Sequence, residues 1–331
     1  MKTFIQALPK VELHLHLEGS LEPELLFELA ERNQVSIPYK DVNEVAAAYN
    51  FDNLQSFLDL YYQASNTLVT SKDFFDLTWA YLQHCKVENV RHVEVFFDPQ
   101  THTERGVSFE TVIEGITQAL QKGKYELGIS YKVIMCFLRH LSERAAFETL
   151  EQAEEFLDLI DGVGLDSGEQ GNPPQKFVNV FAAAREQGLL TVAHAGEEGP
   201  AQYIRDSIEL LQIERIDHGV RITEDEALLA ECVESRIPLT VCPLSNLKLR
   251  VFNTMADHNI LELLGKGLCV TVNSDDPAYF GGYMNANYEA LATDLNASKA
   301  QLKQLALNSI EASWMPEQHK QTLIAEIELL D

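Results

Sequence analysis

The chain alternates between short apolar runs and longer segments in which apolar residues recur at every third or fourth position. Eight of the short runs predict strands, at residues 10–17, 90–98, 129–138, 162–166, 189–196, 215–220, 238–245 and 268–275. Helical patterns between them favour parallel strands joined by crossover helices. Eight such units close into a barrel, so we predict an α/β fold, a (β/α)₈ TIM barrel. A doubly wound open sheet is the alternative, but no G-x-G-x-x-G follows any of these runs.

Glycines mark the expected ends of several helices, in KGK at 122–124, EQG at 186–188 and GKG at 265–267. The segment 18–89 is too long for one crossover and carries several helical patterns rich in Phe, Tyr and Leu. We therefore expect extra helices inserted after strand 1, part of which could cover an active site. No linker or repeat marks a boundary, so residues 1–331 are expected to form a single domain.

The charge of the chain restricts its partners. Fifty-one acidic residues against 25 Lys and Arg give a net charge of −26. Such a surface repels nucleic acid and anionic membranes, because binding to either depends on basic residues. A neutral small molecule is compatible with this charge.

The cysteines indicate a reducing compartment. The five cysteines are widely spaced and include no C-x-x-C pair, and three lie in apolar, strand-like runs. The N-terminus does not resemble a signal peptide, and no run of about 18 apolar residues is present. We expect a cytoplasmic protein.

Metal-competent side chains end several of the predicted strands. His14 and His16 are two residues apart in strand 1 and so project from the same face. His194 ends the fifth strand, His218 the sixth, and Asp275 the eighth. The carboxyl ends of barrel strands meet at one mouth, and burying this many ionisable groups is costly unless they pair or bind a cation. The pattern predicts a metal site.

Three histidines and one carboxylate, with room for water, are typical of a catalytic zinc site. Glu197, three residues after His194, is the natural proton-transfer group, and Asp276 beside Asp275 is a candidate substrate contact. The remaining histidines are interpreted as structural: His84, His102, His140, His258 and His319 because they have no partner in the sequence, and His92 because no second ligand lies beside it.

Ordered motifs give these residues a context. LPKVELHLHLEGS (8–20), VAHAGEEG (192–199), RIDHGV (215–220), CPLSN (242–246) and VNSDDPAYFG (272–281) resemble the adenosine/adenine deaminase family of the amidohydrolase superfamily. The resemblance covers essentially the whole chain. It implies the same barrel, one Zn²⁺ per chain, and hydrolytic removal of the exocyclic amino group of a purine in purine salvage.

The resemblance also implies roles for individual residues. His14, His16, His194 and Asp275 would be zinc ligands. His218 would orient and help to deprotonate the attacking water, and Glu197 would protonate N1 of the ring. Asp276 would contact N7, and the backbone of Gly168 would donate to N3. The Gly168 assignment rests on a segment, GLDSGEQG, that is shorter here than in adenosine deaminases.

The substrate depends on Glu18. Adenosine deaminases commonly have H-x-H-x-D-G, whereas this chain has H-L-H-L-E-G. The longer Glu18 would extend into ribose space, which resembles the adenine-specific branch and predicts adenine as the purine base. Adenosine and N6-substituted adenines are alternatives. A non-enzymatic purine-binding barrel is the alternative of a different class, and it would be expected to lack zinc.

Overall fold

The computed structural model describes residues 1–49, 51 and 53–330. Its centre is an eight-stranded sheet in the order β1 to β8, with every neighbouring pair parallel. The strands are β1 (Lys10–His16), β2 (Val90–Phe97), β3 (Ser130–Leu138), β4 (Gly162–Asp166), β5 (Leu190–Ala195), β6 (Arg215–His218), β7 (Leu239–Val241) and β8 (Val270–Val272). The chain after β8 returns to β1, because His16 N donates to Asp275 O and Asp275 N donates to His14 O. This contact closes the barrel and confirms the predicted fold.

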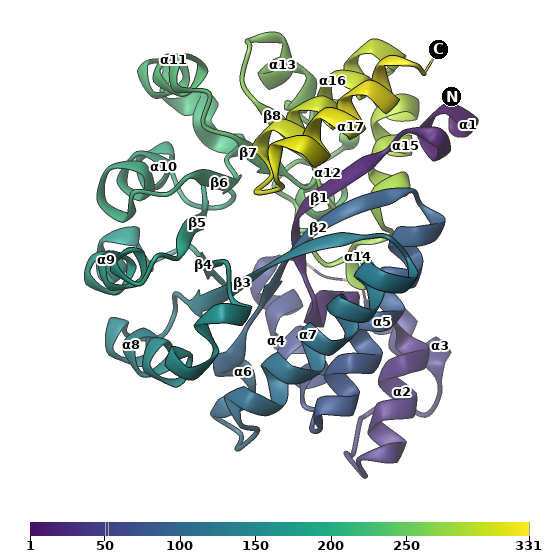
Figure 1. The fold of residues 1–331 in the computed structure, drawn as a ribbon, viewed down its shortest axis with the longest axis vertical. Coiled ribbons are helices and arrows are strands. Elements are labelled where there is room, and N and C mark those ends of the chain that lie inside the picture. The colour runs from purple at the N-terminus through teal and green to yellow at the C-terminus, as the bar shows by residue number, and fades with distance from the viewer. Residues whose placement is uncertain (50, 52, 331) are drawn as a thin grey trace.

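Helices surround the strands on the outside (Figure 1). Those that follow β2 to β7 are α6 (Pro99–Thr103), α7 (Phe109–Glu126), α8 (Glu143–Gln152), α9 (Val178–Glu186), α10 (Ala201–Asp206), α11 (Glu226–Ser235), α12 (Pro243–Lys248) and α13 (Ile260–Gly265). The chain begins with α1 (Lys2–Ala7) and closes with α14 (Pro277–Phe280), α15 (Met284–Asp294), α16 (Lys299–Ala312) and α17 (Glu317–Glu328). Short 3₁₀ turns lie at Glu154–Leu159, Pro174–Phe177, Val220–Glu224 and Met255–Asp257, and a π-turn at Ser207–Leu211.

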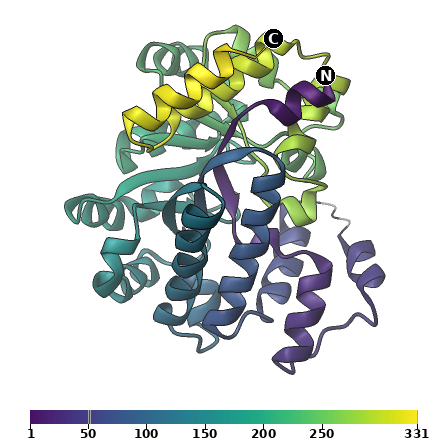
Figure 2. The ribbon, with the colours of Figure 1, turned by 45° about the vertical axis from the view of Figure 1, so that its right-hand side comes forward.

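The segment 18–89 forms the expected helical insertion. It contains the 3₁₀ turn Glu18–Ser20, α2 (Pro23–Arg32), α3 (Val42–Ala48), α4 (Leu54–Ser65) and α5 (Ser71–Val87). Figure 2 shows α2 and α3 at the end of the molecule opposite the two chain termini. Among the described residues, no helix is both long and apolar enough to cross a membrane.

The structure corrects two sequence boundaries. The helix end expected at KGK 122–124 was wrong, because α7 continues to Glu126. Gly123 there lets α7 pack closely on α5, since a β-carbon at this position would lie 2.6 Å from Leu82 Cδ1. Strands 6 to 8 were expected to be longer than they are. His218, the last residue of β6, has φ of 65°, which turns the chain out of the sheet at that point. Asp275 has the same φ beyond β8, where the chain contacts β1.

Candidate metal centre and active site

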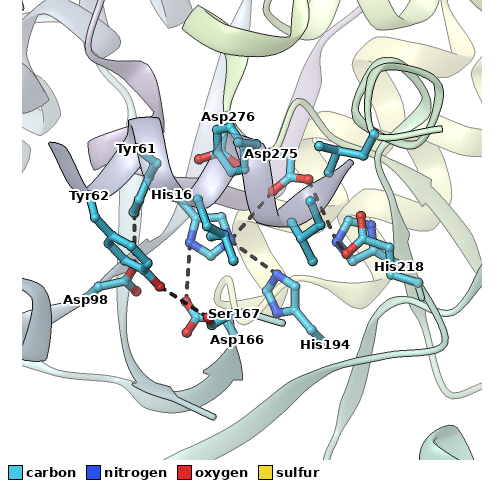
Figure 3. Close-up of a pocket in the computed structure, with 15 residues that line it drawn as sticks. His16, Tyr61, Tyr62, Asp98, Asp166, Ser167, His194, His218, Asp275 and Asp276 are labelled. Carbon is cyan, nitrogen blue, oxygen red and sulfur yellow. Dashed lines mark hydrogen bonds and ion pairs between the residues drawn. The ribbon is translucent and has the colours of Figure 1, made fainter. Parts of the chain in front are cut away.

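Four histidines and an aspartate gather at the carboxyl end of the barrel. Figure 3 shows His16, His194, His218 and Asp275 of this group. His14 and His16 come from β1, His194 from β5 and His218 from the end of β6, and Asp275 follows β8. His16 Nε2 lies 3.2 Å from His194 Nε2. Asp275 Oδ1 lies 3.2 Å from His14 Nε2 and 3.6 Å from His16 Nε2. The structure therefore brings together the residues expected to bind metal.

The spacing of these atoms fits a shared cation. Ligands about 2.0–2.1 Å from a tetrahedral zinc ion lie roughly 3.3 Å from one another. Three pairs, His16–His194, His14–Asp275 and His16–Asp275, are separated by 3.2–3.6 Å, close to that value. The four ligand atoms that all lie within 4.8 Å of one another belong to His14, His194, His218 and Asp275, and His16 reaches the centre through Asp275 and His194. Without a cation, the 3.2 Å contact between the Nε2 atoms of His16 and His194 would be a hydrogen bond, which requires one of the two nitrogens to be protonated.

His14 is held in the tautomer that a metal ligand requires. The Thr240 hydroxyl donates to Asp217 Oδ1 at 2.8 Å, so its oxygen accepts from His14 Nδ1 at 2.9 Å. The proton of a neutral His14 is then on Nδ1, and Nε2 presents a lone pair to the cluster. Among the described residues, this buried Nε2 has no hydrogen-bond partner. Such a hydrogen bond on the far nitrogen is the usual support of a metal-bound histidine.

Positive φ angles occur at non-glycine residues around the centre. His218 and Asp275 have φ of 65° and Ser167, after β4, has φ of 71°. This left-handed conformation is costly for residues with a β-carbon and persists where the surrounding structure imposes it. All three side chains line the pocket beside the metal centre. The strain supports a functional role for this end of the barrel.

Glu197 is positioned by a second carboxylate, Glu169. The carboxylate of Glu169 accepts four successive backbone N–H groups, from Gly196, Glu197, Glu198 and Gly199, at 2.6–3.0 Å. These bonds fix the loop after β5. Burial and the negative charge of Asp275 raise the pKa of Glu197 well above its usual value, which favours a protonated carboxyl group. Glu197 can therefore donate a proton into the pocket.

A chain of hydrogen bonds sets the tautomer of His218. The backbone N–H of Ile260 donates to His258 Nδ1, so the proton of a neutral His258 is on Nε2. That Nε2 faces Asn246 Oδ1 at 3.3 Å, and Asn246 Nδ2 faces His218 Nδ1 at 3.3 Å. Burial lowers the pKa of His218 and of His258 to about 3. A neutral His218 thus presents an N–H, at Nε2, toward Glu197 Oε2 at 3.6 Å and Asp275 Oδ2 at 3.8 Å.

Asp276 lies against the turn that follows β1. A β-carbon on Gly19 would lie 1.9 Å from Asp276 Oδ1, so only glycine allows this approach. Burial and the adjacent Asp275 raise the pKa of Asp276 well above its usual value. Its Oδ1 has no hydrogen-bond partner among the described residues, and the side chain lines the pocket. Asp276 is thus available to a bound molecule.

The rest of the pocket wall comes largely from the insertion. The 15 lining residues include five from α4: Leu54, Phe57, Leu58, Tyr61 and Tyr62. On the side of the pocket near α4, the polar lining residues are Asp98 after β2, Asp166 at the end of β4, and Ser167. Tyr62 Oη lies 3.2 Å from Ser167 Oγ, which joins α4 to the barrel (Figure 3).

Glu18 and Gly168 lie outside this lining. Glu18 is 1% exposed, and its Oε1 accepts from His102 Nε2 at 2.8 Å and from the backbone N–H of Asp98 at 3.2 Å. Gly168 lies in the adjoining outer cavity with Tyr62 and His140. The backbone N–H of Gly168 donates to no protein acceptor in the described part of the chain.

Sequence reasoning missed several residues of the site. His102 and His258 were expected to lack partners, which was wrong, because they contact Glu18 and Asn246. Asp98 and Asp166 end strands as the expected ligands do, so the same rule applied to strands 2 and 4 would have found them. Glu169 and Asn246 gave no comparable signal, since loop carboxylates and amides are common.

Comparisons with known proteins agree with this site. The adenosine deaminase family matches residues 9–329. An adenine deaminase of Wolinella succinogenes is 60% identical over 327 residues, 99% of each chain. The crystal structure of an adenine deaminase from Arthrobacter aurescens is 48% identical, with a TM-score of 0.95 over 97% of this chain and 98% of that one. An amidohydrolase of Burkholderia ambifaria, solved with bound Zn, is 26% identical, with a TM-score of 0.91 over 99% and 93% of the two chains.

Proposed function

This chain belongs to the adenosine deaminase family, and from that premise we propose that it hydrolyses adenine to hypoxanthine and ammonia. The observation that carries the proposal is one buried constellation, with metal-competent residues, Glu197, His218 and Asp276 around a single pocket. Relatives near 60% identity over almost the full chain, named adenine deaminases, support adenine over adenosine. A non-enzymatic barrel would not be expected to keep every member of this constellation.

A metal ion belongs to the family chemistry, and zinc is the ion we propose, one per chain. His14, His16, His194 and Asp275 would hold it, supported by the 3.2–3.6 Å separations of three of their pairs and by the unpartnered Nε2 of His14. When bound, zinc supplies a Lewis acid that makes water nucleophilic near neutral pH.

Glu197 is the proposed proton donor. Its carboxyl group, protonated because burial and Asp275 raise its pKa, donates to ring nitrogen N1. Protonation of N1 draws electrons from C6 and opens that carbon to attack by water. The four backbone bonds to Glu169 support this role by holding the Glu197 loop in place.

His218, Asp276 and Gly168 orient the reactants. His218 directs its Nε2–H toward the attacking water. Because its hydrogen-bond chain places the proton on Nε2, this nitrogen can orient the water as a donor but is not free to accept a proton from it. Asp276, kept protonated by burial and Asp275, donates to N7. The unpaired backbone N–H of Gly168 is available to N3 once the purine reaches the outer edge of the pocket.

The whole of 1–331 is proposed as one domain in which α4 acts as a lid. Five residues of α4 line the pocket, so a movement of this helix would change access to it. Closure excludes water from the reacting carbon. A cytoplasmic location is also proposed, supported by five buried free cysteines.

The test is turnover by the zinc-loaded protein, followed by ultraviolet absorbance with adenine, adenosine and N6-methyladenine in parallel. We expect adenine to be consumed and adenosine to be left intact. Turnover of adenosine would instead make the protein an adenosine deaminase. Zinc-replete protein that converts none of the three would overturn the proposed function.

A further inference from the structure

Asp98 carries a buried carboxylate that lies beside the Asp166 carboxyl group and whose Oδ1 is not satisfied by any N–H or hydroxyl donor among the described residues. The residue is 3% exposed, lines the pocket, and has an Oδ1 without a hydrogen-bond partner among the described residues. Leaving a carboxylate oxygen unpaired in a protein interior is costly. A buried, unpaired acceptor at the wall of a substrate pocket indicates a donor on the substrate.

The surroundings of Asp98 fix its carboxylate in place. Its Oδ2 accepts from the Tyr61 hydroxyl at 3.0 Å, and its backbone N–H donates to Glu18 at 3.2 Å. Glu18 is in turn held by His102. Thus Glu18, the residue expected to extend into ribose space, contacts the backbone of Asp98 and supports it.

The position of Asp98 relative to the metal centre decides which edge of a purine it faces. Asp98 and Asp166 lie beside His16, and His16 Nδ1 is 3.5 Å from Asp166 Oδ2 while its Nε2 faces His194 and Asp275 (Figure 3). The two aspartates are therefore on the side of His16 away from the metal centre. With C6 at that centre and N1 and N7 flanking it, the remote edge of the base carries N3 and N9.

Free adenine has one strong donor on that edge, the N9–H of its 9H tautomer. A nucleoside has none, because N9 carries the sugar. We propose that Asp98 accepts a hydrogen bond from N9–H and thereby selects the free base over nucleosides. This inference rests on the proposed function. A site built around a substrate N–H discriminates strongly against analogues that lack it, because its own acceptor is then left unpaired.

The experiment compares adenine with 9-methyladenine, which lacks the N9 hydrogen. Both are tested as substrates, and 9-methyladenine is also tested as a competitive inhibitor, with the unaltered enzyme, Asp98→Ala and Asp98→Asn. We expect Asp98→Ala to lower kcat/KM for adenine about 10–100-fold, mainly through KM, because a hydrogen bond to a buried acceptor is lost. Binding of 9-methyladenine should stay constant or improve, so that the preference for adenine falls at least roughly 10-fold.

Ser167→Ala is the matched control, because Ser167 lines the same end of the pocket and bonds only to Tyr62 and His140 among described side chains. Ser167→Ala should change kcat/KM for adenine and the affinity for 9-methyladenine by the same factor. The inference would be overturned if the Asp98 variants lost affinity for adenine and for 9-methyladenine equally. It would also be overturned if the unaltered enzyme converted 9-methyladenine as efficiently as adenine. Asp98→Asn keeps the side-chain volume and an amide oxygen that can still accept from N9–H, so it should retain more of the preference for adenine than Asp98→Ala. Asp98→Leu, which removes the acceptor at similar volume, decides the matter if Asp98→Ala does not fold.

The two proposals fail separately. An unaltered, zinc-loaded enzyme without activity on adenine would refute the proposed function. An active enzyme whose preference does not depend on Asp98 would refute only this inference.

Discussion

The carboxylate of Glu169 accepts the backbone N–H of Glu197 at 3.0 Å, so one acidic side chain holds another in place. Three further N–H groups of the same loop point to Glu169, and Arg139 Nη1 lies 3.7 Å away. The loop after β5 is therefore organised around a residue that follows β4. The position of Glu197, the proposed proton donor, depends on a contact between the loops that follow two strands.

Glu169→Gln should slow catalysis without emptying the metal site. The amide turns an N–H group toward backbone donors and removes the charge that they share, at a cost of about 1.5–3 kcal/mol for such bonds. We expect kcat on adenine to fall roughly 10–100-fold with zinc content unchanged. Steady-state kinetics and metal analysis measure this. Glu198→Gln, which removes a neighbouring carboxylate but none of the four bonds, should stay near the activity of the unaltered enzyme.

Gly19→Ala should displace Asp276. The added β-carbon would lie 1.9 Å from Asp276 Oδ1 and 2.5 Å from Cγ, and overpacking of this kind costs about 1–3 kcal/mol. Because Asp276 lines the pocket, we expect kcat/KM for adenine to fall by about 10-fold to 100-fold. Gly265→Ala is the control, since no atom lies within 4 Å of its added β-carbon. Equal activity of the two variants would contradict the proposed contact.

Thr240→Val should weaken metal binding. Valine preserves the shape but cannot accept from His14 Nδ1 or donate to Asp217. Losing such support typically lowers metal affinity about 10–100-fold. Competition with a chromophoric zinc chelator measures the affinity. Thr191→Val, a buried threonine of β5 whose hydroxyl donates to Gln212 O, should bind zinc normally.

Glu94 should make folding sensitive to acid. Burial raises its pKa, but Arg215, with Nη1 at 2.7 Å, and His92, with Nε2 at 3.1 Å, together outweigh burial and lower the pKa from 4.5 to about 2. The unfolded chain therefore binds the proton first. The stabilisation, about 3 kcal/mol, is fully present above pH 4.5 and is lost as pH falls through 2.

Denaturant unfolding across pH 5 to 2.5 tests this linkage. Glu94→Gln should be less stable near neutral pH, because Arg215 loses its buried partner, and its stability should depend less on pH in the acid range. An exposed change, Glu110→Gln, should leave the profile intact. A Glu94→Gln profile parallel to that of the unaltered protein would rule out this source of acid sensitivity.

The sequence by itself determined the barrel and the chemical character of its mouth. Strand and helix periodicities are local properties, and His14, His16, His194, His218 and Asp275 could be recognised because parallel strands bring their carboxyl ends together. Only the tertiary structure decided which side chains line the pocket. It turned Glu18 toward His102, left an oxygen of Asp98 free at the pocket wall, and joined Glu169 to the Glu197 loop. These relationships link residues far apart in the chain, and their geometry depends on the packing of several loops at once, which no local pattern encodes.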